Sequence, residues 1–110
     1  MNMNQRLKAE QLHQLDNNQK EMLRKQWTPE EGHYIALGDH EEMVYYLNGV
    51  EKHKALPLLS IGQMMEYLVE CDASFTMNYD SSMWQVSVSG HSYQNDELCD
   101  VLWEAMKQIL

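Results

Sequence analysis

The residues of this sequence that could do chemistry are mainly carboxylates, and they form two rows with helical spacing. Glu66 and Glu70 are four residues apart, and Asp96, Asp100 and Glu104 repeat the same interval near the end of the chain. Residues at i and i+4 lie on one face of a helix, so each row predicts an acidic stripe. Such stripes can simply keep a protein soluble, or they can mimic the charges of a nucleic-acid backbone and bind a protein with a basic groove.

Aromatic side chains among the acids would strengthen the second interpretation, because tyrosines often anchor protein interfaces. Tyr45 and Tyr46 are adjacent in a predicted strand, so one of them must face outward. Tyr93 falls in a predicted loop. The expected partner-binding residues are therefore Glu66, Glu70, Asp96, Asp100, Glu104, Tyr45, Tyr46 and Tyr93.

The charge balance narrows the class of ligand. The chain has 17 Asp and Glu against eight Lys and Arg, a formal net charge of −9, and residues 28–110 hold 14 of the acids but only three lysines. Direct binding of a nucleic acid needs a basic patch, so it is disfavoured. An alternative is an oligomeric sponge or sensor for a small signalling molecule such as a nucleotide. That alternative requires Arg24, Lys25, Lys52 and Lys54 to converge.

Residues that could form a metal site or a catalytic pair lack the spacing that such sites require. His33, His40 and His53 lie near carboxylates but lack the spacing of a zinc site, so no metal is expected. Cys71 and His91 are the only candidates for a Cys–His pair, and nothing in the sequence brings them together. The two cysteines are expected to be buried thiols, with a disulfide as the alternative. We therefore expect a protein that is not an enzyme and has no cofactor.

The elements that must position these side chains follow from periodicity and capping. A helix over 60–71 begins at a capping box of Ser60 and Gln63 and carries apolar residues at helical spacing. Alternation over 73–79 and 84–88 predicts a hairpin with one apolar face. The other predicted segments are a helix over 18–26, strands over 33–37 and 43–47, a loop over 90–94 and a helix over 96–110.

Together these segments predict an α+β fold. It would have a small, mostly antiparallel sheet of about four strands, packed by two helices, with an N-terminal helical arm. The change in composition at Trp27 divides the chain into an arm, 1–27, and an acidic domain, 28–110. For the first 15 residues a docked helix and a frayed tail are both open.

The N-terminal segment lacks the apolar stretch that is typical of a signal peptide, and no apolar run in the sequence is long enough to span a bilayer. These observations predict a cytoplasmic protein without a membrane partner. The stripe of Leu12, Leu15 and Leu23 allows a third alternative, in which residues 1–27 dock on a second copy of the chain.

Short motifs carry a resemblance to a known group of proteins. The second half has the order helix–strand–strand–helix and closes on ELCDVLWEA, residues 97–105. Upstream stand WTPEEGHY, residues 27–34, and Leu56-Pro57 before Gln63-Met64-Met65. This pattern resembles small phage and prophage proteins of Gram-positive bacteria with an ABA-sandwich layout, although His33 replaces an expected Asp. The resemblance implies a phage origin and no catalytic residue. Together with the charge, it predicts an inhibitor of a host nuclease, defence effector or transcription component.

Overall fold

A computed structural model describes residues 3–110 of the chain. Its contacts divide the chain into two compact units. The N-terminal unit comprises residues 7–59, and the C-terminal unit comprises residues 60–109 with the segment that ends at Arg6. This division differs from the one after Trp27 that the composition indicates, since residues 7–27 belong with 28–59. Residues 1 and 2 of the predicted arm lie outside the described residues.

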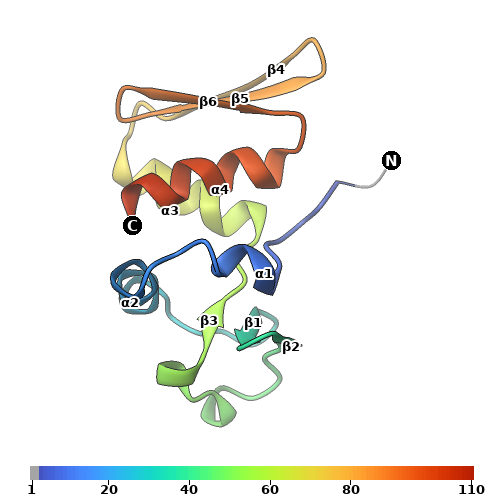
Figure 1. Ribbon diagram of the computed structural model, residues 1–110, viewed down its shortest axis with the longest axis vertical. Coiled ribbons are helices and arrows are strands. Elements are labelled where there is room, and N and C mark those ends of the chain that lie inside the picture. Colours follow the sequence, from blue (N-terminus) through green and yellow to red (C-terminus); the bar gives the residue numbers. More distant parts are fainter. Residues whose placement is uncertain (1–2) are drawn as a thin grey trace. The chain divides into compact units, whose positions relative to one another are not determined.

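The N-terminal unit is built from short elements around a small sheet (Figure 1). Its antiparallel sheet has the strand order β2-β1-β3, and Ile35 of β1 pairs with Glu42 on one side and with Pro57 on the other. The elements are α1 (Ala9–Leu12), α2 (Asn17–Gln26), β1 (Tyr34–Leu37), β2 (His40–Met43), η1 (Leu47–Gly49), η2 (Lys52–Lys54) and β3 (Leu56–Pro57).

The core of this unit collects apolar residues from segments far apart in the sequence. Trp27, Ile35, Val44 and Ala55 form one buried cluster. The stripe residues of the predicted arm, Leu12, Leu15 and Leu23, are also buried within the chain. The stripe that would have docked on a second copy is therefore not exposed.

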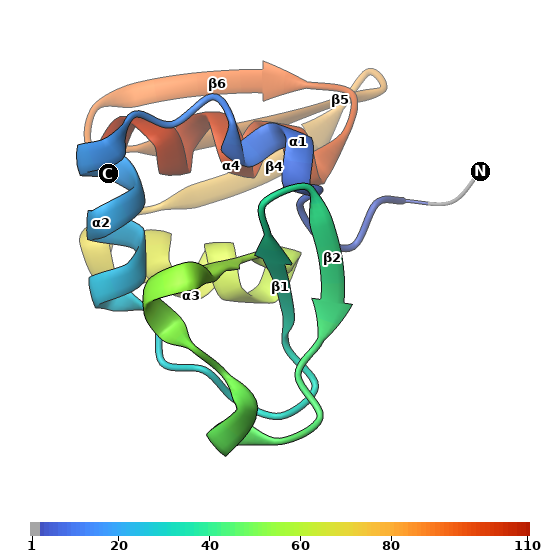
Figure 2. The same ribbon diagram turned by 60° about the horizontal axis from the view of Figure 1, so that its bottom comes forward.

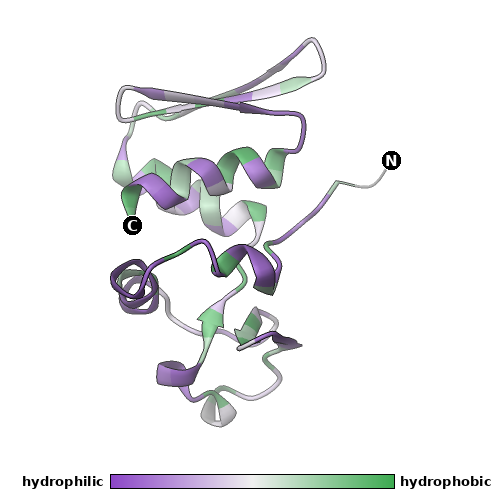
Figure 3. Cartoon of the chain, in the orientation of Figure 1, coloured by the Kyte–Doolittle hydropathy of each residue, from purple (hydrophilic) through white to green (hydrophobic). Residues whose placement is uncertain are grey.

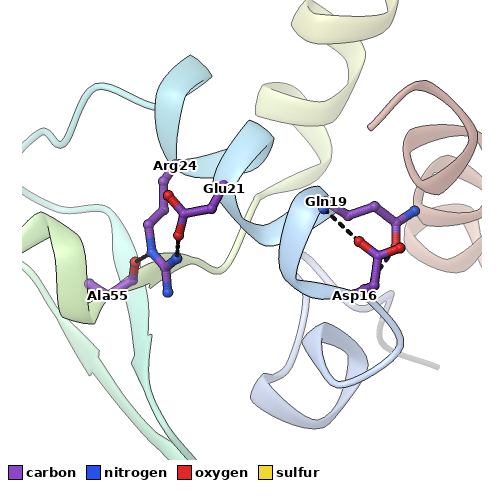
Figure 4. Close-up of polar contacts among 5 residues, drawn as sticks. All are labelled: Asp16, Gln19, Glu21, Arg24 and Ala55. Atoms are coloured by element: carbon purple, nitrogen blue, oxygen red, sulfur yellow. Dashed lines mark hydrogen bonds and ion pairs between the residues drawn. The ribbon is translucent and has the colours of Figure 1, made fainter.

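Helix α2 is mostly hydrophilic (Figure 3) and is stabilised at its start by a capping box. Asp16 accepts a hydrogen bond from the backbone N–H of Gln19, and Gln19 accepts one from the N–H of Asp16 (Figure 4). The sequence predicts that this helix starts two residues after Asp16, with Asn18 as the N-cap and Glu21 as its partner. Either pair of residues fits the capping pattern, and in the structure Asp16, whose backbone is extended, is the N-cap.

The C-terminal unit is a three-stranded antiparallel meander covered on one face by helix α4, with α3 beside it (Figures 1 and 2). Its central strand is β5, and both hairpins pair with it. The elements are α3 (Ile61–Cys71), β4 (Thr76–Asp80), β5 (Met83–Val88), β6 (His91–Asn95) and α4 (Leu98–Ile109).

Alternation along the strands of this sheet places most of the apolar residues on one face. Val86 and Val88 are buried on one face, together with the apolar side of α4. The opposite face carries polar side chains at Asn78, Gln85 and Gln94, and the hydroxyls of Ser87 and Ser92 lie 2.9 Å apart across two strands. A sheet with one covered face and one solvated face follows from this pattern.

Two-residue turns join the strands. Ser81 and Ser82 connect the pair Asp80–Met83, and Ser89 and Gly90 connect Val88–His91. All four turn residues have positive φ, between 51° and 79°, as type I′ turns require. Ser89-Gly90 places glycine at one of these positions, whereas Ser81-Ser82 places none.

The α+β class and the capped helix at Ser60 are confirmed. The single sheet of about four strands is only roughly matched, because there are two sheets of three strands each. The strand predicted over 43–47 is wrong. Strand β2 ends at Met43, because Met43 pairs with Tyr34, the first residue of β1, and β1 has no further residue to pair with 44–47. The loop predicted over 90–94 is also wrong, because the tight turn at Ser89-Gly90 returns the chain as β6.

Removing the cap of α3 tests how much that helix start contributes. The Ser60 hydroxyl accepts from the N–H of Gln63 at 3.1 Å, so Ser60→Ala should lower the free energy of unfolding by about 1 kcal/mol. That loss corresponds to a fall in Tm of roughly 5 °C for a chain of this size. Ser60→Asp keeps an acceptor and should stay near the wild type. Equal losses for both variants in urea denaturation would contradict the capping role.

The turn at Ser81-Ser82 offers a stabilising substitution. Ser81→Asn with Ser82→Gly should raise the free energy of unfolding by about 1 kcal/mol, because asparagine and glycine adopt positive φ at lower cost than serine. The matched control is Ser81→Ala with Ser82→Ala, which keeps the strained φ values and should destabilise. Thermal melts of both variants provide the comparison. A double variant Asn-Gly that melts below the wild type would show that the turn is not of this type.

Candidate functional site

The acidic residues predicted on α3 are exposed on its solvent side. Glu66 and Glu70 lie opposite Met64 and Leu68, which are fully buried. Among residues 3–110 neither glutamate makes an ion pair. Val69, three residues after Glu66, is 50% exposed. Burial raises the pKa of Tyr67, and the nearby charges of Glu70 and Glu66 raise it further. The helix thus presents two carboxylates without ion pairs and one exposed apolar side chain to solvent.

The second row lies at the start and along the solvent side of α4. Asp96 is exposed before the helix, Asp100 is half-buried, and Glu104 is exposed and pairs with Lys107 at 3.0 Å. Helices α3 and α4 pack together and run in the same direction (Figures 1 and 2). The structure therefore brings the two predicted rows onto neighbouring helices of one unit. We call these five residues the acidic helical surface.

Two other carboxylates of the C-terminal unit have structural contacts. Asp72 accepts hydrogen bonds from the N–H and hydroxyl of Ser74 and from the N–H of Ser89, and these bonds lower its pKa, the Ser74 hydroxyl most. Glu97 accepts from the N–H of Asn4 at 2.8 Å. Asp72 therefore links the end of α3 to the β5–β6 turn by hydrogen bonds. Its carboxylate is engaged in these bonds and does not orient Cys71 for catalysis.

The net charge is divided unequally between the units. Counting the sequence by unit, the C-terminal unit has eight Asp and Glu against Arg6 and Lys107, which gives −6. The N-terminal unit has nine acids against six Lys and Arg, which gives −3. Most of the negative charge therefore belongs to the unit that carries the acidic helical surface.

The three predicted tyrosine anchors differ in placement. Tyr45 and Tyr46 are 69% and 75% exposed, but they belong to the N-terminal unit, where they line a pocket of about 220 Å³ with Ile35 and Val44. Tyr93 lies in strand β6 rather than in a loop. It is half-buried because it stands opposite Val86 on the face that α4 covers.

The few cations of the N-terminal unit converge around Arg24. Arg24, Lys25 and Lys52 line one open depression with His53. A second, more enclosed pocket of about 200 Å³, here called the cationic pocket, is lined by Lys20, Arg24, Lys54 and His13. Its other lining residues are small or apolar: Ala9, Leu12, Ala36, Gly38 and Leu56. Sequence reasoning missed Lys20, although its spacing of four from Arg24 predicts that both lie on one helix face.

Hydrogen bonds and ion pairs hold these cations in place. Arg24 donates from Nε to the carbonyl of Ala55 at 3.1 Å and from a terminal nitrogen to Glu21 (Figure 4). Lys54 pairs with Glu51 at 2.9 Å. The hydrogen bond from Lys54, then its charge, lowers the pKa of Glu51. Lys20 makes no ion pair within the described part of the chain.

Three histidines lie beside single carboxylates. His13 lies 3.0 Å from Asp39, His33 lies 3.3 Å from Glu30, and His40 lies 3.1 Å from Glu42. In residues 3–110 no group of three His, Cys, Asp or Glu side chains could hold a metal ion. Glu41 is in strand β2 and accepts a hydrogen bond from the N–H of Ala9 at 2.6 Å. Across the same residues, every helix is too short or too polar to cross a membrane.

Comparison with known proteins adds no relative. The chain matches no protein-family model, no curated protein and no solved structure.

The two thiols should differ strongly in reactivity. Cys71 is exposed and contacts the hydroxyl of Ser89 at 4.0 Å, whereas Cys99 is buried. Burial, then the charges of Asp100 and Glu97, raises the pKa of Cys99 to about 11. Near pH 8 Cys99 is therefore a neutral, inaccessible thiol, and only thiolates react rapidly with disulfide reagents. Ellman's reagent should titrate one thiol in the native protein and both in denaturant. Cys71→Ser should abolish the native reaction; a fast reaction remaining in that variant would contradict the burial of Cys99.

Proposed function

We propose that this protein is a non-enzymatic binding protein whose acidic helical surface occupies a basic groove of another protein. The observation that carries the proposal is the −6 charge of the C-terminal unit, with Glu66, Glu70 and Asp96 exposed and without ion pairs among residues 3–110. Carboxylates spaced along two adjacent helices can stand in for a row of phosphates. The same charges would speed association and make it sensitive to salt.

The resemblance to phage proteins suggests the setting for such binding. In that setting the protein would act in the cytoplasm of an infected bacterium. It would inhibit a host nuclease, defence effector or transcription component whose groove normally holds nucleic acid. Blocking such a groove needs no catalytic group, and the acidic helical surface uses none. Val69 would supply an apolar contact within the charged surface. Tyr45, Tyr46 and Tyr93 remain candidate anchors.

Neutralising the exposed pair on α3 tests the proposal. The protein, tagged and incubated with host lysate at about 50 mM salt, should retain a partner that about 0.5 M salt releases, because exposed charges are screened at high ionic strength. With the purified partner, Glu66→Gln with Glu70→Gln should weaken binding about tenfold, which corresponds to about 0.7 kcal/mol for each exposed charge.

A control of equal charge distinguishes this surface from net charge alone. Glu10 and Glu31 are exposed in the N-terminal unit, so Glu10→Gln with Glu31→Gln removes two charges without touching the acidic helical surface. This control should bind within about twofold of the wild type, since exposed charges outside the contact are screened by salt. Equal weakening by both double variants, or a partner retained at high salt, would overturn the proposal.

A further inference from the structure

The cationic pocket of the N-terminal unit is a concave site that the acidic helical surface does not use. It brings Lys20 and Arg24 from α2 together with Lys54 from the end of η2. Its lining contains no Asp or Glu, although the unit to which it belongs has three more acids than cations. Arg24 and Lys54 pair with Glu21 and Glu51, and His13 pairs with Asp39, all carboxylates outside the lining. Lys20 therefore supplies the uncompensated positive charge that an anion would meet in this pocket.

The state of each cation indicates the type of anion. The guanidinium of Arg24 already donates from Nε and from one terminal nitrogen, so it cannot offer its full fork to a carboxylate. Lys20 is half-buried and makes no ion pair within residues 3–110. Lys54 is exposed and shares its charge with Glu51. Two ammonium groups and part of one guanidinium act as point charges, which suits a phosphoryl group better than the planar pairing of a carboxylate.

The size and surroundings of the pocket restrict the ligand further. A volume of about 200 Å³ is below the roughly 300 Å³ at which pockets enclose drug-sized molecules. That volume suits one phosphoryl group with a small apolar neighbour, for which Leu12 and Leu56 offer apolar contacts. Arg24 also lines the adjoining open depression with Lys25 and Lys52, so a second phosphoryl group would meet further cations there.

We infer that the cationic pocket binds a small phosphorylated ligand, with one phosphoryl group among Lys20, Arg24 and Lys54 and a second reaching Lys25 and Lys52. The ligand is recognised by its phosphates, and the rest of it lies at the open side. This site is independent of the acidic helical surface, since its residues all belong to the N-terminal unit.

Isothermal titration calorimetry on the full chain tests the inference with four probes: inorganic phosphate, pyrophosphate, ADP and adenosine, each at matched ionic strength. We expect saturable binding of pyrophosphate and ADP at one site per chain, weaker binding of phosphate, and no heat from adenosine. ADP binding tighter than pyrophosphate would identify a nucleotide, and equal binding would identify the phosphates alone as the recognised group. Absence of saturable binding by pyrophosphate and ADP would overturn the inference.

Variants locate the site. Lys20→Gln should lower the affinity for pyrophosphate at least about tenfold, because it removes the cation without an ion pair. Lys8→Gln makes the same change at an exposed lysine that lines neither depression, and it should bind like the wild type. If Lys20→Gln lowers the melting temperature, Lys54→Gln, which changes an exposed side chain, replaces it in the binding measurement. Wild-type affinity in both Lys20→Gln and Lys54→Gln would exclude this pocket.

Discussion

The packing of α4 against the central strand β5 is the contact on which the C-terminal unit depends. A three-stranded sheet has marginal stability until its apolar face is covered, and Val86 and Val88 provide that face. Seven of the twelve residues of helix α4 are buried, and the helix packs against this sheet and against α3. So much of the helix is buried that few positions remain for charged side chains. Asp100 and Glu104 occupy two of them, so the place of the second acidic row is a consequence of packing.

Sequence reasoning succeeded where one local rule decided the structure. The capping box at Ser60 and Gln63 and the alternation through β4 and β5 are local patterns, and both are found. Strand β6 was missed because His91-Ser92-Tyr93-Gln94-Asn95 has little β propensity on its own. Pairing with β5 across a two-residue turn makes it a strand. The separation into two sheets was also missed, since it depends on long-range contacts that no local pattern encodes.

The two candidate sites differ in how far the sequence predicts them, because one depends on local spacing and the other on the fold. The acidic rows follow from a spacing of four, and such a spacing can be read directly. The sequence identifies Arg24, Lys25, Lys52 and Lys54 as the cations that would have to converge on a small ligand. Whether they converge depends on a fold that brings residue 54 next to residues 20 and 24, and no local pattern encodes that fold. The net charge of −9 does not reveal such a local group of cations either.

The sheet of the C-terminal unit ends in two open edges, since within residues 3–110 β4 and β6 each pair only with β5. Strand β4 has one charged residue, Asp80 at its end, and β6 has no Asp, Glu, Lys or Arg. Such edges are templates for pairing with another chain unless charge or covering prevents it. Because these strands carry so little charge themselves, protection comes from repulsion between the C-terminal units of two copies, each with a charge of −6. The acidity of the unit thus opposes aggregation. Concentrated salt or acid weakens the repulsion and would therefore favour edge-to-edge assembly of the protein into fibres or swapped dimers.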